Sequence, residues 1–137
     1  PQRVWAFYGA RRAELAAVRP NPAHRALADL QRLFTARAGR YTLITQNIDG
    51  MHQAAGSEEV LELHGSLRRI RCSACDHGVE LDNGADLPEQ SCPVCGRPMR
   101  PDVVWFGEAL PGDILVDATR AVTDCDAFLS VGTSGVV

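Results

Sequence analysis

The sequence predicts an α/β fold in which a small four-cysteine zinc ribbon interrupts a parallel sheet. Two observations predict it. Short apolar runs alternate with segments of helical periodicity, a pattern typical of a parallel sheet with helical connections. Between two of these runs lie the paired C-x-x-C motifs Cys72/Cys75 and Cys92/Cys95, with sixteen residues between the pairs. That spacing is typical of a zinc ribbon.

The first forty residues predict two helices. Residues 4–18 are rich in Ala, Leu, Glu and Arg and favour the first helix. Pro20 interrupts this segment, after which Asn21 is a good N-cap and Pro22 a good first residue of the second helix. Gly39 is expected to end that helix. Its apolar stripe consists of His24, Leu27, Ala28, Leu30, Leu33 and Phe34.

The rest of the chain predicts buried strands and one more helix. Residues 41–45 and 60–63 are expected as strands around polar residues 46–50, and residues 72–99 form the zinc insert. We expect a helix over 114–123 and a last buried strand over 127–131. Because ligands bind beyond the carboxyl ends of such strands, the segments 46–50 and 132–135 are candidate walls of one cleft. A Gly-Thr-Ser-Gly run alone is weak evidence, since turns are often rich in Gly and Ser.

The paired cysteines favour a structural metal. Each C-x-x-C can sit on a tight turn, and four thiolates complete a tetrahedral Zn²⁺ site without leaving a position for a catalytic water. Pro93, Gly96 and Gly78 are residues that such turns prefer. The alternative is two disulfides, which require an oxidising compartment. Nothing in the sequence resembles a secretory signal, so we expect a cytoplasmic protein with a zinc site.

Composition argues against two classes of partner. The net charge of −3 argues against general nucleic-acid binding, which usually needs a basic face. No apolar run is long enough to span a bilayer, so no membrane partner is expected. The fifth cysteine, Cys125, lies between two aspartates that oppose thiolate formation, and we expect an inert buried thiol there.

Five segments in this order resemble the sirtuins, the NAD-dependent protein-lysine deacylases. They are 45–52 (TQNIDGMH), 63–66 (LHGS), the paired C-x-x-C motifs, 103–108 (VVWFGE) and 132–134 (GTS). The resemblance implies NAD and Zn²⁺ as cofactors, and acyl-lysine proteins or peptides as partners. It also implies a Rossmann-like sheet, here incomplete, carried by residues 1–66 and 102–137 around a zinc module at 67–101.

The resemblance implies roles for the polar segments. His64 corresponds to the catalytic base: in the family the substrate's amide oxygen attacks C1′ of the nicotinamide riboside, nicotinamide leaves, and the histidine activates a ribose hydroxyl. The alternative is a structural histidine bonded to backbone. The cofactor contacts would be Gln46, Asn47, Ile48, Asp49, Gly132, Thr133 and Ser134. The alternative for 46–49 is a turn that caps itself through Asn and Asp. We take His24 and His52 as structural.

The resemblance also implies a substrate-binding segment that pairs with an extended peptide. Its residues are Val103, Val104, Trp105, Phe106, Gly107 and Glu108. Pairing of a peptide with an exposed strand edge would be β-augmentation. Trp105 and Phe106 are more often core residues than ligand contacts, although Phe106 can also wall the acyl-lysine tunnel.

Tyr8 and Arg11 resemble the acyl-reading Y-x-x-R pair of class III sirtuins, which prefer succinyl and malonyl groups. Residues three apart share a helix face, and an arginine can clasp a carboxylate with two hydrogen bonds. The alternative is an ordinary surface Tyr and Arg. Arg12 points about 100° away from Arg11 and is expected to take no part.

The sequence departs from the family pattern at both ends. It lacks the G-A-G-x-S motif that holds the pyrophosphate, and it lacks the strands that follow Gly-Thr-Ser. We therefore expect a fragment that exposes sheet edges and binds NAD poorly, and its own activity stays open. The main alternative is a non-catalytic zinc-stapled module that binds peptides or proteins. A zinc-ribbon nucleic-acid binder is a third alternative, disfavoured by the acidic balance.

Overall fold

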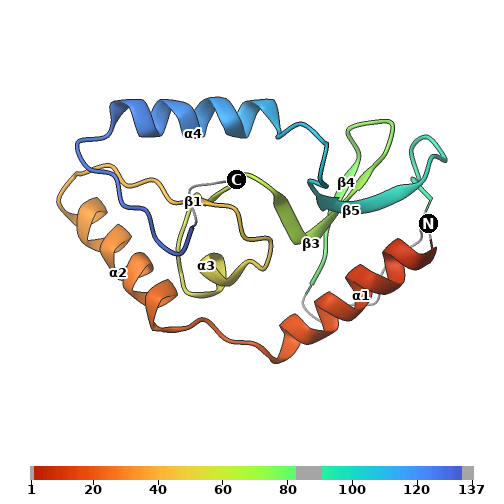
Figure 1. The fold of residues 1–137 in the computed structure, drawn as a ribbon, viewed down its shortest axis with the longest axis horizontal. Helices are drawn as coiled ribbons and strands as arrows, with labels where there is room; N and C mark the ends of the chain where they lie inside the picture. The colour runs from red at the N-terminus through yellow and green to blue at the C-terminus, as the bar shows by residue number, and fades with distance from the viewer. Residues whose placement is uncertain (1, 83–90, 134–137) are drawn as a thin grey trace.

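Two small sheets and four helices make up the part of the chain that the computed structural model describes, residues 2–82 and 91–133. In Figure 1 the helices α2 and α3 lie with β1 in one half of the molecule, and α1 lies with β3, β4 and β5 in the other. The elements in chain order are α1 (Gln2–Ala17), α2 (Pro22–Ala36), β1 (Ile44–Thr45), α3 (Met51–Ala54), β2 (Leu61–Glu62), β3 (Gly65–Cys72), β4 (Gly78–Glu80), β5 (Met99–Val103) and α4 (Gly112–Asp124).

The apolar runs predict parallel strands, and the structure contains one short parallel pair. β1 and β2 run parallel with Ile44 opposite Leu61. The backbone N–H of Leu61 donates to Leu43 at 2.9 Å, and that of Leu63 donates to Thr45 at 2.9 Å. Because the strands are parallel, their carboxyl ends lie at the same edge, where residues 46 and 64 follow.

The second sheet is antiparallel and carries the cysteine segment. Its strand order is β4-β3-β5, with an irregularity in the pairing between Ser66 and Ile70. The three strands bring the two C-x-x-C turns to one end. Within the described residues β5 pairs only with β3, so it is an edge strand.

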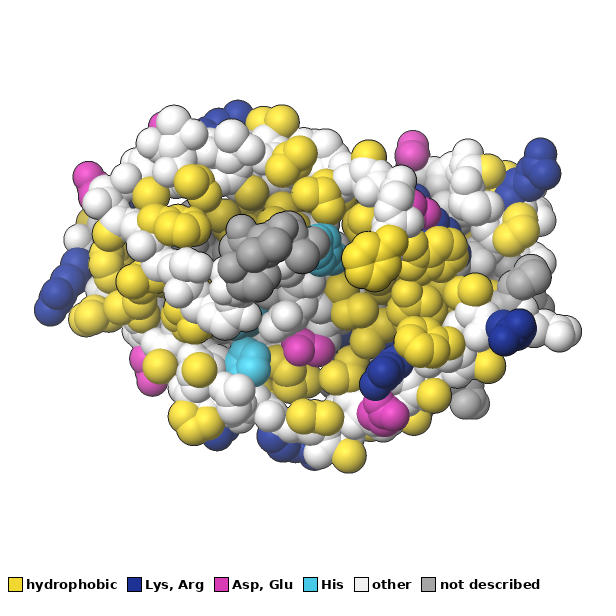
Figure 2. Space-filling view, viewed as in Figure 1, with side chains coloured by type: hydrophobic (Ala, Val, Ile, Leu, Met, Phe, Trp, Pro, Cys, Tyr) yellow, Lys and Arg dark blue, Asp and Glu magenta, His cyan; other side chains and the backbone are white. Residues whose placement is uncertain are grey.

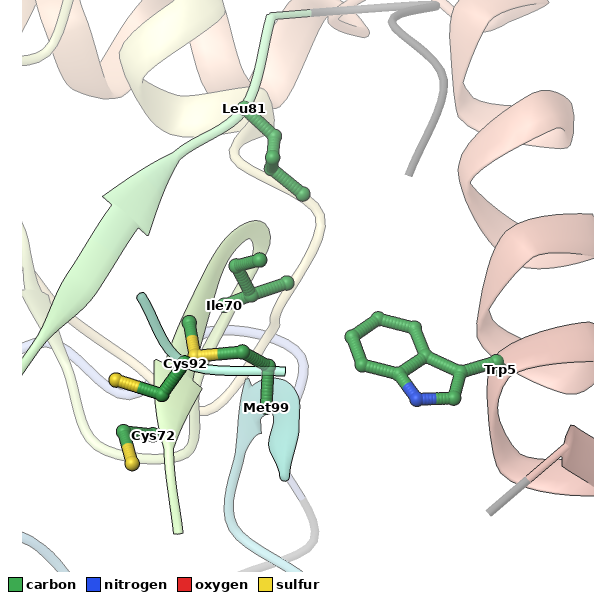
Figure 3. Close-up of a cluster of buried hydrophobic side chains, with 6 residues drawn as sticks. All are labelled: Trp5, Ile70, Cys72, Leu81, Cys92 and Met99. Atoms are coloured by element: carbon green, nitrogen blue, oxygen red, sulfur yellow. The ribbon is translucent and has the colours of Figure 1, made fainter. Parts of the chain in front are cut away.

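The main buried hydrophobic cluster joins α1 to this second sheet. Trp5 is 5% exposed and points from α1 toward Ile70 and Met99 (Figure 3). Leu81, Cys72 and Cys92 complete the cluster. Since a tryptophan buries a large apolar area, Trp5 is the main hydrophobic anchor of α1.

Arg12 is a second anchor of α1, and it points away from Arg11 as the helix geometry predicts. Its guanidinium donates to the carbonyl of Leu67 at 2.5 Å and to that of Asp82 at 3.0 Å. Burial, and secondarily the nearby Arg68, lower the pKa of Arg12. The helix turns Arg12 toward β3 and leaves Arg11 outside, so Arg12→Met would disturb the docking of α1.

The predicted start and end of α2 are confirmed. The side chain of Asn21 accepts from the backbone of His24 at 3.1 Å, and His24 Nδ1 accepts from the backbone of Asn21 at 3.2 Å. This reciprocal pair is a capping box with histidine at the third position. At the other end the N–H of Gly39 donates to Phe34 at 2.9 Å, which closes the last turn. The helices predicted over 4–18 and 114–123 are also confirmed as α1 and α4.

Three expectations about burial are wrong. Residues 127–131 form no strand and are exposed, with Phe128 at 64%. A buried strand needs a neighbour for its backbone groups, and neither described sheet extends to this run. Cys125 is exposed just after α4, where its thiol donates to Val122 at 3.2 Å. Phe106 is fully exposed because it lies on the turn after β5.

No helix within residues 2–82 and 91–133 has the length and apolar character needed to cross a membrane.

Candidate functional site

The predicted base and the predicted cofactor segment meet at the carboxyl edge of the parallel strands. Gln46 follows β1 directly, and His64 lies two residues after β2. The Nδ1 atom of His64 lies 3.0 Å from the carbonyl oxygen of Gln46. The structure therefore brings together two residues that are eighteen positions apart in the sequence.

This hydrogen bond sets the tautomer of His64. A carbonyl oxygen can only accept, so Nδ1 carries the hydrogen and Nε2 keeps its lone pair. The residue is partly exposed, and no hydrogen-bond partner of Nε2 is present among the described residues. A neutral imidazole held in this way can take a proton from a hydroxyl group that approaches Nε2.

Backbone contacts hold three segments around His64. The N–H of Val104 donates to the His64 carbonyl at 3.0 Å, and the N–H of Leu67 donates to Ile48 at 2.8 Å. Gly65 adopts a φ of +77°, and a Cβ there would lie 2.0 Å from the carbonyl oxygen of Asp102. Only glycine fits this crossing. The end of β5 is thereby fixed beside the histidine.

The turn after β1 is partly self-capping. Asp49 Oδ1 accepts from the N–H of Met51 at 2.9 Å, and Thr45 Oγ1 accepts from Asn47 at 3.1 Å. The alternative of a self-capping turn thus describes what Asp49 does in the structure. Gln46 and Asn47 expose their side chains, so their amides face solvent at the same edge as His64.

His52 and His24 form a packed pair beside this turn. Their ring centroids are 4.7 Å apart, and Nδ1 of His52 is buried without a hydrogen-bond partner among the described residues. Burial, followed by the nearby His24, lowers the pKa of His52, whereas Asp49 opposes that shift. The neutral ring is therefore favoured, as suits a histidine that packs between two helices.

The four predicted zinc ligands converge. All four Sγ atoms lie within 4.8 Å of one another. Cys72 and Cys95 are 3.4 Å apart, Cys75 and Cys95 3.6 Å, and Cys75 and Cys92 3.7 Å. Sulfurs bound to one tetrahedral zinc at ~2.3 Å would be about 3.8 Å apart, so the cluster fits Zn²⁺. These separations are too long for disulfides.

Backbone bonds orient both cysteine turns, and among the thiols Cys72 has a lowered pKa whereas hydrogen bonds to neighbouring thiols help to raise the pKa values of Cys75 and Cys95. Each C-x-x-C lies on a turn closed by backbone bonds: Cys72 N–H donates to His77 at 2.8 Å, and Cys92 N–H donates to Arg97 at 2.8 Å. Burial opposes ionisation of Cys72, but hydrogen bonds from the backbone of Ala74 and Cys75 and from neighbouring thiols lower its pKa to about 6. A thiolate there is the form that a metal requires.

Tyr8 lines a shallow hollow between α1 and the segment after β5. The hollow has a volume of about 280 Å³, and its other lining residues are Arg3, Val4, Phe7 and Trp105. Figure 2 shows hydrophobic side chains gathered over the region between α1 and strands β3 and β5. Tyr8 therefore lies where an apolar chain with a polar end can enter.

Arg11 is not among the residues that line this hollow. Its guanidinium pairs with Glu14 at 3.1 Å, in an exposed pair, and lies 5.5 Å from the ring centroid of Phe7. Arg11 is thus linked to the hollow only through Phe7, which is one of the lining residues. Of the two predicted acyl readers, Tyr8 therefore lines the hollow and Arg11 does not.

The predicted peptide segment divides into a buried part and an exposed part. Val103 ends β5 and is buried, whereas Phe106 is fully exposed. Glu108 pairs with Arg100, and hydrogen bonds from Arg100 and from the Trp105 backbone lower the pKa of Glu108 to about 2. Sequence reasoning missed Arg100, because a single arginine at the end of the zinc module carries no signal of its own.

The predicted cofactor contacts at residues 132–134 lie at the limit of the described chain. Gly132 and Thr133 are exposed, with Gly132 at a φ of +67°. Ser134 lies outside the described residues.

We predict one Zn²⁺ per chain, bound by the four cysteines of the cluster. Cys95→Ser should remove the metal and lower the thermal unfolding temperature, because metal binding contributes to folding. Cys125→Ser, which changes an exposed cysteine outside the cluster, is the matched control and should change neither quantity. Elemental analysis of freshly reduced protein checks the prediction, and absence of zinc there would contradict it.

Comparison with known proteins gives one family. The family model described as Sir2 family matches residues 1–137. An NAD-dependent protein deacylase of Thermus thermophilus is 47% identical over 137 residues, which are 100% of this chain and 54% of that protein. NAD-dependent protein deacylase 1 of Pseudomonas aeruginosa is 47% identical over 145 residues, covering 100% of this chain and 56% of that protein. The chain spans about half the length of the curated relatives it matches.

Comparison with solved structures gives the same family. A Sir2 homologue in complex with NAD matches with a TM-score of 0.88 and 43% identity, covering 100% of this chain and 52% of that one. A Sir2 protein bound to an acetylated peptide matches with a TM-score of 0.65 and 33% identity, covering 81% and 47%. These neighbours share the Rossmann-like α/β fold with a parallel sheet. The chain belongs to the Sir2 family.

Proposed function

We propose that this chain carries the catalytic centre of an NAD-dependent protein-lysine deacylase that prefers succinyl- and malonyl-lysine and removes acetyl groups more weakly. The acyl group would pass from lysine to ADP-ribose, with release of nicotinamide. The observation that carries the proposal is the bond between His64 Nδ1 and the Gln46 carbonyl at the carboxyl edge of two parallel strands. The names of the deacylase relatives support it.

The side chains at this edge fit NAD. Gln46 and Asn47 expose amides, which can donate to and accept from ribose hydroxyls and a carboxamide. The backbone around Ile48 is held by Leu67, so the segment is ordered before any ligand binds. Asp49 would act through the turn that it caps. When bound, NAD supplies the ribose carbon that receives the acyl oxygen and the hydroxyl that His64 deprotonates.

His64 would act as a general base through Nε2. The Gln46 carbonyl keeps the hydrogen on Nδ1 and orients the ring, so the lone pair on Nε2 is the site that accepts the proton. The same carbonyl would stabilise the imidazolium that forms, because the Nδ1–H bond strengthens when the ring is charged.

The edge strand β5 would bind the substrate peptide. The end of β5 lies beside His64, because the N–H of Val104 donates to the His64 carbonyl on the edge that pairs with β3. The opposite edge of β5 pairs with no strand within the described residues. A peptide that adds to this edge would bring its acyl-lysine next to the base. Solved Sir2 structures that hold acetylated or p53 peptides support a peptide as the partner.

Tyr8 and Arg11 would read the acyl group. The exposed pair of Arg11 with Glu14 contributes little, as exposed ion pairs generally do, so Glu14 is a weak competitor for the guanidinium. A carboxylate that enters the hollow beside Tyr8 is less solvated and would form the stronger pair. An acetyl group offers no charge to Arg11.

A non-catalytic peptide-binding module is the second candidate, favoured by the zinc-stapled sheet and its edge strand. Nicotinamide release from NAD in the presence of an acyl-lysine peptide separates the two. The full-length protein should release nicotinamide, and binding without release would favour the module.

We predict that His64→Ala lowers turnover by about 10²-fold or more, the usual contribution of a positioned base. Zinc content and unfolding temperature should stay close to those of the wild type, because the ring is partly exposed. Nicotinamide release by the full-length protein measures the effect, and near-normal turnover would contradict the assignment.

We predict that Arg11→Met lowers kcat/KM for succinyl-lysine about 10- to 100-fold more than for acetyl-lysine, since a charge-assisted pair is lost. The matched control is Arg120→Met, which removes an equally exposed arginine from an i,i+3 pair, with Asp117 on α4. Steady-state rates with both peptides test this. If Arg11→Met slows both substrates equally, the class III interpretation fails.

A further inference from the structure

The side chain of Trp105 contacts Tyr8 on α1 and Arg100 on β5. Its indole Nε1–H donates to the hydroxyl oxygen of Tyr8 on α1 at 2.8 Å. On its other side the guanidinium carbon of Arg100 lies 3.6 Å from the ring centroid, a close cation–π contact. The indole therefore bridges α1 and β5.

Arg100 and Glu108 close the turn around Trp105. Arg100 donates to both carboxylate oxygens of Glu108, at 2.5 and 3.0 Å, and to the carbonyl of Val103 at 2.8 Å. Glu108 in turn accepts from the backbone N–H of Trp105 at 2.9 Å. The side chain of Arg100 is only 16% exposed. A two-pronged pair in such a place fixes the turn geometrically, so the indole has a defined position.

The bond to Trp105 determines what the Tyr8 hydroxyl can do. An indole nitrogen only donates, so the oxygen of Tyr8 must accept, and its own hydrogen is directed elsewhere. Tyr8 and Trp105 both line the hollow, together with Phe7. The hydrogen bond from the Trp105 indole therefore orients the Tyr8 hydroxyl at the hollow.

We propose that Trp105 is a positioning residue for acyl selectivity: its indole N–H holds Tyr8 as a hydrogen-bond donor toward the acidic end of an acyl group, and the Arg100–Glu108 pair fixes Trp105. The inference rests on the proposed deacylase function and on Tyr8 as an acyl reader. The donated N–H also polarises the phenol, which strengthens its O–H as a donor to a carboxylate.

The test uses Trp105→Phe in the full-length protein, which keeps an aromatic ring against Arg100 and removes the N–H. We expect kcat/KM for succinyl-lysine to fall about fivefold more than for acetyl-lysine, the usual contribution of one hydrogen bond. The extra loss should lie in KM. Trp5→Phe, the same change in the core of α1, is the matched control and should lower stability without changing the succinyl-to-acetyl ratio.

A double-mutant cycle separates this inference from the proposed function. If Trp105 acts through Tyr8, the double variant Trp105→Phe/Tyr8→Phe should have the same succinyl-to-acetyl ratio as Tyr8→Phe alone. Additive effects, or an unchanged ratio in Trp105→Phe while Tyr8→Phe lowers it, overturn the inference and leave the acyl-reading proposal standing. An unchanged ratio in Tyr8→Phe overturns both. Absence of nicotinamide release by the wild type overturns the deacylase function itself.

Discussion

The close crossing of Gly65 over the carbonyl of Asp102 is the constraint on which the site depends. A Cβ at position 65 would lie 2.0 Å from that oxygen and 3.2 Å from the Cα of Val103. The crossing places the turn after β2, with His64 on it, directly against the end of β5. The turn that carries His64, the proposed base, and the end of β5 are neighbours because the two backbones approach this closely.

A network of charged side chains also holds the two sheets together near this crossing. Arg69 on β3 donates to Glu62 on β2 at 2.8 Å and to Asp102 on β5 at 2.9 Å, so one guanidinium joins both sheets. Glu62 is 5% exposed and also accepts from Gln53 at 2.8 Å. Burial opposes the charge of Arg69, but Asp102 and Glu62 outweigh it and raise its pKa. Loss of one partner would leave a buried charge unpaired, which is strongly destabilising.

The sequence predicted what depends on local chemistry. Cysteine spacing identified a sulfur cluster, and Asn21 and Pro22 identified the start of α2. Strand-end polarity marked residues 46–50 as one wall of a cleft, whereas the family resemblance assigned His64 to the same site. It did not predict what depends on partners distant in the chain. Arg12 looks like any surface arginine until β3 offers its carbonyls, and the run 127–131 looks like a strand although no described strand pairs with it. Arg69 and Arg100 were missed for the same reason, since their carboxylate partners are not adjacent in sequence.

The most direct test of the central claim is the activity of Gly65→Ala in the full-length protein, measured beside Gly56→Ala. Both glycines have positive φ, but a Cβ at position 56 would meet only the flexible end of Arg32, at 3.3 Å. Gly65→Ala should push β5 away from His64 and lower deacylation by about 10²-fold, the cost of a displacement near 1 Å. Gly56→Ala should lower stability through backbone strain and leave the activity nearly unchanged. Equal, small effects on activity in the two variants would contradict the account.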